Sequence, residues 1–153
     1  MRQQDILPNY DWVLADLCAL IIERQKKDPE LFGMVAAAVV DNNGHIVSNT
    51  SYNKDNKWVH AERAAINSYK IRHSDVPAGS IIVTTLSPCC KSMSDRYGSN
   101  CTDFITDLGI ETVYYGYYDP TQQIDHVAFD LIESDNPQIK ELCKLFADTF
   151  LSD

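Results

Sequence analysis

The sequence contains no apolar run that approaches the roughly 18 residues needed to cross a membrane. Its first nine residues include one arginine and few apolar side chains, so we do not expect them to be a secretory signal. We therefore expect a cytoplasmic protein that does not bind membranes. With 153 residues, 44% of them hydrophobic, the chain can form one domain over residues 1–153 with a sizeable core.

Positive charge is also scarce. Lys and Arg together number 13 against 22 Asp and Glu, and the formal net charge is −9. Proteins that bind DNA or RNA usually offer a basic face to the phosphates, whereas the one short basic cluster here consists of Arg24, Lys26 and Lys27. We therefore expect no nucleic-acid polymer as a partner, while a small nucleotide, which needs one or two cations, stays compatible with this charge.

The five cysteines make a poor disulfide framework, because their number is odd and we expect no secretion signal. Cys18 and Cys143 occupy apolar positions of predicted helices, and we expect both to be buried core residues. Cys89, Cys90 and Cys101 instead gather in and around a polar loop that follows a proline. These three need another explanation.

Hydrophobic periodicity and turn signals divide the chain into helices and strands. Apolar residues that recur every three or four positions predict an amphipathic helix over residues 10–27. Two strands, over residues 34–40 and 45–51, flank the turn signal D-N-N-G and predict a hairpin. A polar loop over residues 52–57 follows.

The rest of the chain alternates helix and strand. We expect helices over residues 59–71, 101–108, 124–133 and 138–151, and strands over residues 80–86 and 110–117. A hairpin followed by this alternation indicates an α/β fold, with helices on both faces of a mixed sheet in three α/β/α layers.

Two motifs carry the chemistry. The first is W-V-H-A-E over residues 58–62, and the second is S-P-C-C over residues 87–90 with Cys101 beyond it. Catalytic zinc usually has three protein ligands and keeps a fourth position for water. One histidine and two thiolates would nearly neutralise Zn²⁺ and still let it acidify that water. We predict that His60, Cys89 and Cys101 bind zinc.

Glu62 follows His60 by two residues, which on a regular helix separates two side chains by about 200°. The pair can converge on one metal only in the first turn, where the geometry is irregular, and the sequence places it there. Glu62 then suits a general acid and base that takes a proton from water and delivers it to the substrate nitrogen and the leaving amine. The dipole of the helix that Cys101 begins favours its thiolate form.

These motifs resemble the zinc deaminase signature H-x-E followed by P-C-x-x-C. His60, Glu62 and Cys89 match it, but position 92 is serine, so Cys101 is the next candidate ligand. A long loop between two cysteine ligands resembles the deaminase domain of riboflavin-biosynthesis enzymes, within the cytidine and deoxycytidylate deaminase superfamily. The pattern T-L-E-P-C of that domain corresponds to T-L-S-P-C over residues 85–89, and its later D-P to residues 119–120.

The resemblance covers about residues 10–120 and implies a cytidine-deaminase-like fold and a zinc-dependent hydrolase of nucleotide metabolism. The enzyme would release ammonia from a small nitrogen heterocycle: a base, a nucleoside, a nucleotide or a riboflavin-precursor-like pyrimidine. Members often form dimers or tetramers, so we expect a homo-oligomer. Three departures stand out: Ser87 replaces the usual Glu, the loop is longer, and no reductase domain follows in this sequence, so we do not expect the bifunctional riboflavin enzyme.

Three polar residues are predicted to bind the substrate. Asn53 falls where many nucleoside and nucleotide deaminases carry an Asn that contacts substrate. Lys91 and Arg96 lie in the loop beside the predicted metal and could contact a substrate phosphate. The alternative is that the loop is simply a solvated segment without this role.

Two other functions remain open. A closed zinc site in which Cys90 becomes a fourth ligand would give a non-catalytic, structural-zinc domain for protein interaction. Adjacent cysteines rarely both reach one metal, because neighbouring side chains diverge. We expect Cys89 rather than Cys90 to bind the metal, because Cys89 directly follows Pro88. A polynucleotide-editing deaminase is the third hypothesis, and the acidic balance argues against it.

Overall fold

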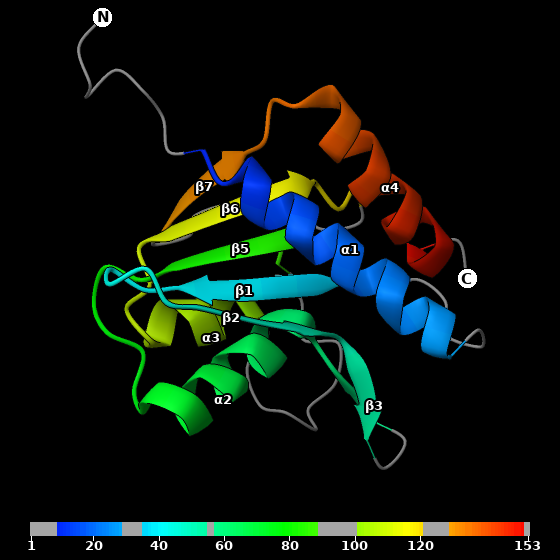
Figure 1. The fold of residues 1–153 in the computed structure, drawn as a ribbon. Coiled ribbons are helices and arrows are strands. Elements are labelled where there is room, and N and C mark those ends of the chain that lie inside the picture. The colour runs from blue at the N-terminus through cyan, green and yellow to red at the C-terminus, as the bar shows by residue number, and fades with distance from the viewer. Residues whose placement is uncertain (1–8, 29–34, 55–56, 89–100, 121–128, 152–153) are drawn as a thin grey trace, which may run out of the picture.

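Five strands form one sheet, and helices cover both of its faces (Figure 1). The computed structural model describes residues 9–28, 35–54, 57–88, 101–120 and 129–151; for residues 53–54, 57–58, 101 and 148–151 it describes the backbone alone. In chain order the described elements are α1 (Asp11–Lys27), β1 (Ala36–Val40), β2 (Ile46–Thr50), β3 (Tyr52–Lys54), β4 (Lys57–Val59), α2 (Ala61–His73), β5 (Ile81–Leu86), α3 (Cys101–Asp107), β6 (Thr112–Tyr117), β7 (Asp130–Glu133) and α4 (Pro137–Leu151).

The sheet is mixed, with the strand order β2-β1-β5-β6-β7. β1 pairs antiparallel with β2 and β5, whereas β5, β6 and β7 run parallel. In a crossover between parallel strands the helix runs back along the sheet. The first residue of α3 therefore lies near the edge of the sheet where β5 and β6 end, and the turn between β1 and β2 lies at the opposite edge.

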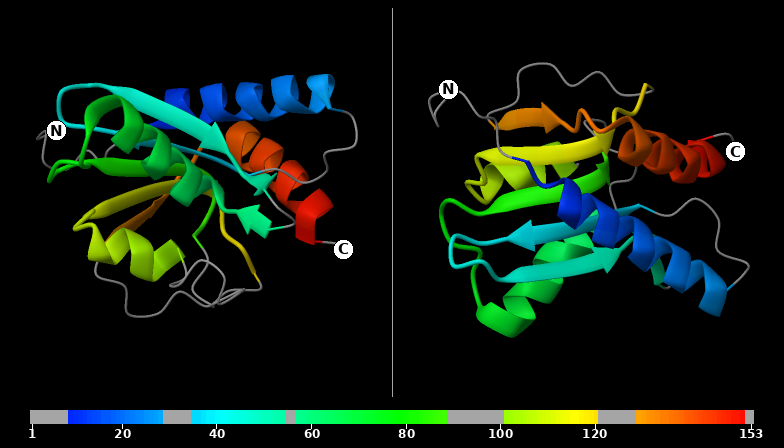
Figure 2. Two further views of the ribbon diagram at one scale, coloured as in Figure 1. Left: turned by 90° about the horizontal axis from the view of Figure 1, so that it is seen from below. Right: turned by 45° about the horizontal axis from the view of Figure 1, so that its top comes forward.

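Two hydrophobic cores separate the layers. On one face, α1 and α4 pack against the sheet through residues such as Leu14, Leu17 and Phe146, and on the other α2 and α3 do so through Ile66 and Ile105. Figure 2 shows the same three layers, with α1 and α4 on one side of the sheet and α2 and α3 on the other. The predicted α/β/α arrangement with a mixed sheet is confirmed.

Cys18 and Cys143 are buried, as predicted, and join two helices of one layer. Their Sγ atoms, on α1 and α4, lie 3.8 Å apart. Gly116 on β6 provides the space for this contact, because a Cβ atom at that position would collide with Cys143 Sγ. The pair is therefore part of the core between α1, α4 and the sheet.

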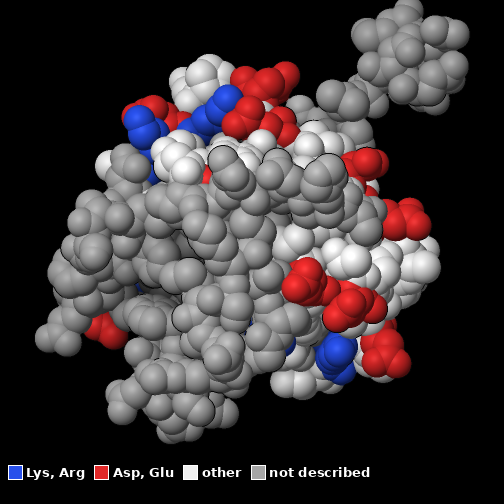
Figure 3. Space-filling model, turned by 180° about the vertical axis from the view of Figure 1, so that it is seen from behind, with Lys and Arg blue, Asp and Glu red and all other residues white. Residues whose placement is uncertain are grey.

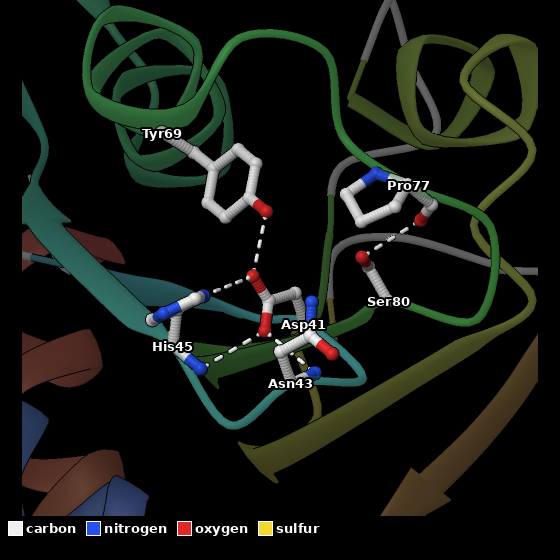
Figure 4. A network of polar contacts seen from close by, with 6 residues as sticks. All are labelled: Asp41, Asn43, His45, Tyr69, Pro77 and Ser80. Atoms are coloured by element: carbon white, nitrogen blue, oxygen red, sulfur yellow. Dashed lines mark hydrogen bonds and ion pairs between the residues drawn. The ribbon is translucent and has the colours of Figure 1, made fainter.

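Asp41 holds the turn between β1 and β2 (Figure 4). Its carboxylate accepts hydrogen bonds from the Tyr69 hydroxyl at 2.7 Å and from the backbone N–H groups of Asn43 and His45, each at 2.9 Å. His45 Nδ1 lies 3.0 Å from the same carboxylate. The network connects the far end of α2 to the hairpin, at the edge of the sheet away from His60.

The predicted elements agree with the observed ones to within two residues at each end over most of the chain. The predicted loop over residues 52–57 is wrong, because β3 and β4 pair there as a short antiparallel hairpin in which Tyr52 lies opposite Val59. Val59 accordingly belongs to a strand, and the following helix begins at Ala61. Three-residue strands leave too little periodicity for the sequence to reveal them.

The predicted helix over residues 124–133 is also wrong where the structure describes it. Residues Asp130–Glu133 form β7, which pairs in parallel with β6 and extends the sheet by one strand. Parallel pairing joins residues far apart in the sequence, and four residues of mixed polarity carry no local signal of it. Residues 124–128 lie outside the described part.

In the part of the chain that the structure describes, no helix combines the length and apolar character that a membrane span requires.

Candidate active site

His60 and Glu62 lie at the irregular start of α2, as the sequence predicts. His60 is the residue before the helix, in an extended conformation with φ −68° and ψ 151°, and its carbonyl accepts the N–H of Ala64 at 2.9 Å. Glu62 is the second residue of the helix. Since His60 is not helical, the angular separation of two helical residues does not apply to this pair.

Glu62 is almost completely buried, with 4% of its surface exposed. The fully buried Thr84 of β5 donates a hydrogen bond from Oγ1 to Glu62 Oε1 at 3.1 Å. A carboxyl group loses much hydration on burial, so such a position requires polar partners and is typical of functional sites. The positive end of the α2 dipole further favours a carboxylate in the first turn.

Ser87 connects the loops that follow β5 and β6. Its N–H donates to the carbonyl of Tyr117 at 2.9 Å, and its Oγ accepts the N–H of Asp119 at 2.8 Å. Ser87 is buried, so its hydroxyl replaces water as the partner of that N–H. The serine that departs from the T-L-E-P-C pattern thus holds the segment leading to Pro88 against the D-P loop.

The helix that follows His60 and the helix that begins at Cys101 contact each other. The guanidinium carbon of Arg63 on α2 lies 4.0 Å from the ring centroid of Phe104 on α3. This cation–π contact lies within one turn of both helix starts, so it fixes one start relative to the other. Glu62 thus lies between the end of β5, where Thr84 contacts it, and Arg63, the next residue of α2, which contacts α3.

The remaining predicted site residues are described in part or not at all. Asn53 lies in β3 opposite Trp58, and Cys101 is the first residue of α3, each known by its backbone alone. Cys89, Cys90, Lys91 and Arg96 lie outside the described residues. Within the described side chains, which include neither predicted thiolate, no three His, Cys, Asp or Glu residues form a metal-binding group.

Thr84 is a site residue that the sequence analysis did not identify. A signal for it exists, because Thr84 and Thr85 are adjacent polar residues in an otherwise apolar strand. Alternation along a strand places them on opposite faces of the sheet, so one of the two had to face the helix that carries Glu62. Deciding which one requires the strand's register and the position of α2.

Comparison with known proteins identifies the family. A family model described as the cytidine and deoxycytidylate deaminase zinc-binding region matches residues 13–117, more than half of the chain and a stretch that includes both motifs. The chain belongs to this family. The resemblance seen in the sequence is confirmed, and membership in a family of zinc-binding deaminases supports the predicted Zn²⁺ cofactor and hydrolase class.

One curated relative is the diaminohydroxyphosphoribosylamino-pyrimidine deaminase of Schizosaccharomyces pombe, which is 31% identical over 113 residues. The match covers 72% of this chain and 27% of the relative, so this deaminase-family chain spans about a quarter of that protein's length. The predicted similarity to riboflavin-biosynthesis deaminases is consistent with this match.

Solved structures confirm the fold. The crystal structure of a diaminohydroxyphosphoribosylaminopyrimidine deaminase/5-amino-6-(5-phosphoribosylamino)uracil reductase from Thermotoga maritima matches with a TM-score of 0.59 at 24% identity, covering 90% of this chain and 42% of that one. The dCMP deaminase of cyanophage S-TIM5 in apo form matches with a TM-score of 0.54 at 17% identity, covering 88% of this chain and 100% of that one. At these identities the similarity concerns the fold.

Proposed function

We propose that this chain is a zinc-dependent hydrolytic deaminase that acts on a small heterocycle of pyrimidine type. The observation that carries the proposal is the buried Glu62 carboxyl group, held by Thr84 beside the helix start at His60. A purely structural zinc site has no need of a buried carboxyl group that is not a ligand, whereas a deaminase needs one for proton transfer.

The donor set suits zinc. Imidazole and thiolates are its usual protein ligands, and His60, Cys89 and Cys101 would hold it. The partly buried His60 next to a carboxyl group that is 4% exposed fits a cation in this place. When bound, zinc would supply a Lewis acid that makes water nucleophilic near neutral pH. Cys90 stays outside this set because adjacent side chains diverge.

Glu62 moves the protons in the proposed reaction. Its carboxylate takes one proton from the attacking water and delivers it to the ring nitrogen next to the amine-bearing carbon. A carbon–oxygen bond forms at that carbon, the carbon–nitrogen bond to the amine breaks, and Glu62 passes a further proton from the oxygen to the leaving group. One water is consumed, one ammonia is released, and Glu62 returns to its starting state.

The substrate is proposed to be a phosphorylated pyrimidine. The names of two similar proteins specify a phosphoribosylamino-pyrimidine and dCMP, which both combine a pyrimidine with a phosphate. In this chain Asn53 would contact the substrate, and Lys91 or Arg96 would bind its phosphate. A single domain over residues 1–153, a homodimer or homotetramer, and a cytoplasmic location remain predictions.

The test is ammonia release by purified protein of known metal content, measured across a panel of pyrimidine and purine bases, nucleosides, nucleotides and pteridines. We expect release from a pyrimidine nucleotide, and Glu62→Ala should abolish it while zinc stays near one per chain. Glu23→Ala, which removes an exposed carboxylate on α1, should behave like the unchanged protein. Zinc binding without release from any compound, or full activity of Glu62→Ala, would contradict the proposal.

A further inference from the structure

We propose that Thr84 is a positioning residue, which orients the Glu62 carboxyl group for proton transfer and fixes it relative to the segment that leads to Cys89. The inference rests on the proposed deaminase function, since it assigns Thr84 a role through Glu62. It concerns a residue outside the two motifs that carry the chemistry, W-V-H-A-E over residues 58–62 and S-P-C-C over residues 87–90.

Three atoms carry the geometry. Thr84 Oγ1 lies 3.1 Å from Glu62 Oε1 and 2.8 Å from the carbonyl oxygen of Leu86. Thr84 is completely buried and Glu62 nearly so, so bulk water does not replace either contact. Leu86 is the last residue of β5 and is followed by the S-P-C-C segment. One hydroxyl group thus touches both the carboxyl group and the backbone that carries a predicted metal ligand.

A hydroxyl group suits a neighbour that gains and loses a proton during a reaction. It offers one hydrogen and two lone pairs. Thr84 can donate to Glu62 while the latter is a carboxylate. Once Glu62 holds the transferred proton, Thr84 can accept a hydrogen bond from it and donate its own hydrogen to Leu86. A hydrogen bond therefore holds the carboxyl group before and after the transfer, and an apolar side chain of the same shape offers neither.

The neighbouring Thr85 is a control that separates an effect on the position of Glu62 from an effect on the stability of β5. It is equally part of β5 and buried, but its Oγ1 accepts the N–H of Ala36 at 3.2 Å. Alternation along β5 directs it to the face of the sheet opposite Glu62. Replacing either threonine by valine removes one buried hydroxyl group, so both variants should be less stable than the unchanged protein. Of the two, Thr84→Val alone changes the surroundings of Glu62.

The kinetic test compares Thr84→Val, Thr84→Ser and Thr85→Val in the zinc-loaded protein, with the compound that the panel identifies. Thr84→Val should lower kcat about 10- to 100-fold, by analogy with the loss of a partner that orients a metal ligand, with KM and zinc content little changed. Thr84→Ser keeps the hydroxyl group and should recover most of kcat. Thr85→Val should keep the kcat of the unchanged protein. If Thr84→Val also keeps that kcat, the proposal is wrong.

A second measurement does not depend on activity. The melting temperature is compared for the unchanged protein, Thr84→Val, Glu62→Ala and the double variant. If the two residues are coupled, Thr84→Val should lower the melting temperature less in the Glu62→Ala background, because there is then no carboxyl group that loses the hydrogen bond from Thr84. Additive shifts would overturn the inference. Absence of any deamination would refute the proposed function alone, and the melting comparison would still decide whether Thr84 orients Glu62.

Discussion

Individual polar side chains in this protein are buried where they are needed to hold a carboxyl group or a loop. Glu62, Thr84 and Ser87 are all at most 4% exposed, and each takes part in a hydrogen bond that spans two elements or two loops. A buried polar group that loses its partner costs about 1–3 kcal/mol. Substitutions at these positions therefore act through the partner left behind as much as through the side chain removed.

Among the residues that the structure describes, Asp41 is a carboxylate whose charge should make stability depend on pH. The hydrogen bond from the Tyr69 hydroxyl holds the pKa of Asp41 well below its ordinary value. Burial opposes this shift, and the hydrogen bonds from His45 and Asn43 add to it. A lowered pKa in the folded state means that the carboxylate stabilises the fold above the unfolded-state pKa of about 3.9. This contribution is lost as the pH falls below that value towards the folded-state pKa.

We therefore expect Asp41→Asn to lower the free energy of unfolding most at neutral pH. The difference from the unchanged protein should shrink as the pH falls below about 4. Urea unfolding between pH 7 and pH 3 measures it, with Asp16→Asn, an exposed position of α1, as the control that should stay close to the unchanged protein throughout. A difference that is constant over this range would show that the charge of Asp41 contributes nothing to folding.

At the scale of secondary-structure elements, the site is formed where α2, α3 and β5 meet. α2 follows the residue His60 and contains Glu62, α3 begins at Cys101, and β5 contributes Thr84. These elements are held by the shared core of one face of the sheet, with Ile66 and Ile105 in it. The relative position of His60 and Cys101 thus depends on how two helices pack, and the Arg63–Phe104 contact links these helices close to both residues.

Weakening the contact between Arg63 and Phe104 should reduce the affinity for zinc. Arg63→Met keeps an unbranched side chain but removes the guanidinium, and Phe104→Leu removes the ring. Since a cation–π contact contributes about 0.5–1 kcal/mol, each should raise the zinc dissociation constant about two- to fivefold. Competition with a chelating dye measures the constant.

Arg72→Met is the matched control, because Arg72 is exposed near the far end of the same helix. It should leave zinc affinity unchanged. Arg63 has further interactions, so the double variant is decisive: Arg63→Met should have less effect when Phe104 is already leucine. Independent effects of the two substitutions would mean that the contact does not connect the helices to the metal.

At the scale of the whole molecule, negative charge dominates. The net charge is −9, and Figure 3 shows acidic side chains spread over the described part of one face, with few basic ones among them. Long-range repulsion of this kind lowers the affinity for a polyanion, whereas a single phosphate can still be bound by one or two local cations. The overall charge therefore favours a small substrate over a nucleic-acid polymer.

We accordingly expect the protein not to bind a single-stranded DNA or RNA oligonucleotide. Fluorescence anisotropy at low ionic strength measures this, at protein concentrations up to about 100 μM, which cover the range of weak non-specific binding. A mononucleotide that the protein deaminates should still bind under the same conditions. Salt-dependent binding of the oligonucleotide would instead revive the hypothesis of a polynucleotide-editing deaminase.

Local sequence patterns were enough to predict the long helices and strands and to recognise the two zinc-deaminase motifs. The period of α1, the turn signal after β1 and the apolar run of β5 act over a few neighbouring residues, so they could be recognised without the fold. The H-A-E and P-C motifs could also be recognised without the fold. Each consists of neighbouring residues, one at the predicted start of a helix and the other at the predicted end of a strand. The family followed from these residues.

The tertiary structure alone decided features that depend on residues distant in the sequence. β7 forms because β6 offers it a parallel partner, and β3 and β4 are strands only because they pair with each other. Thr84 became part of the site because the register of β5 and the position of α2 place its hydroxyl group beside Glu62. The chemistry is thus encoded by short motifs, whereas the orientation of the groups is set by packing between elements that the chain brings together only on folding.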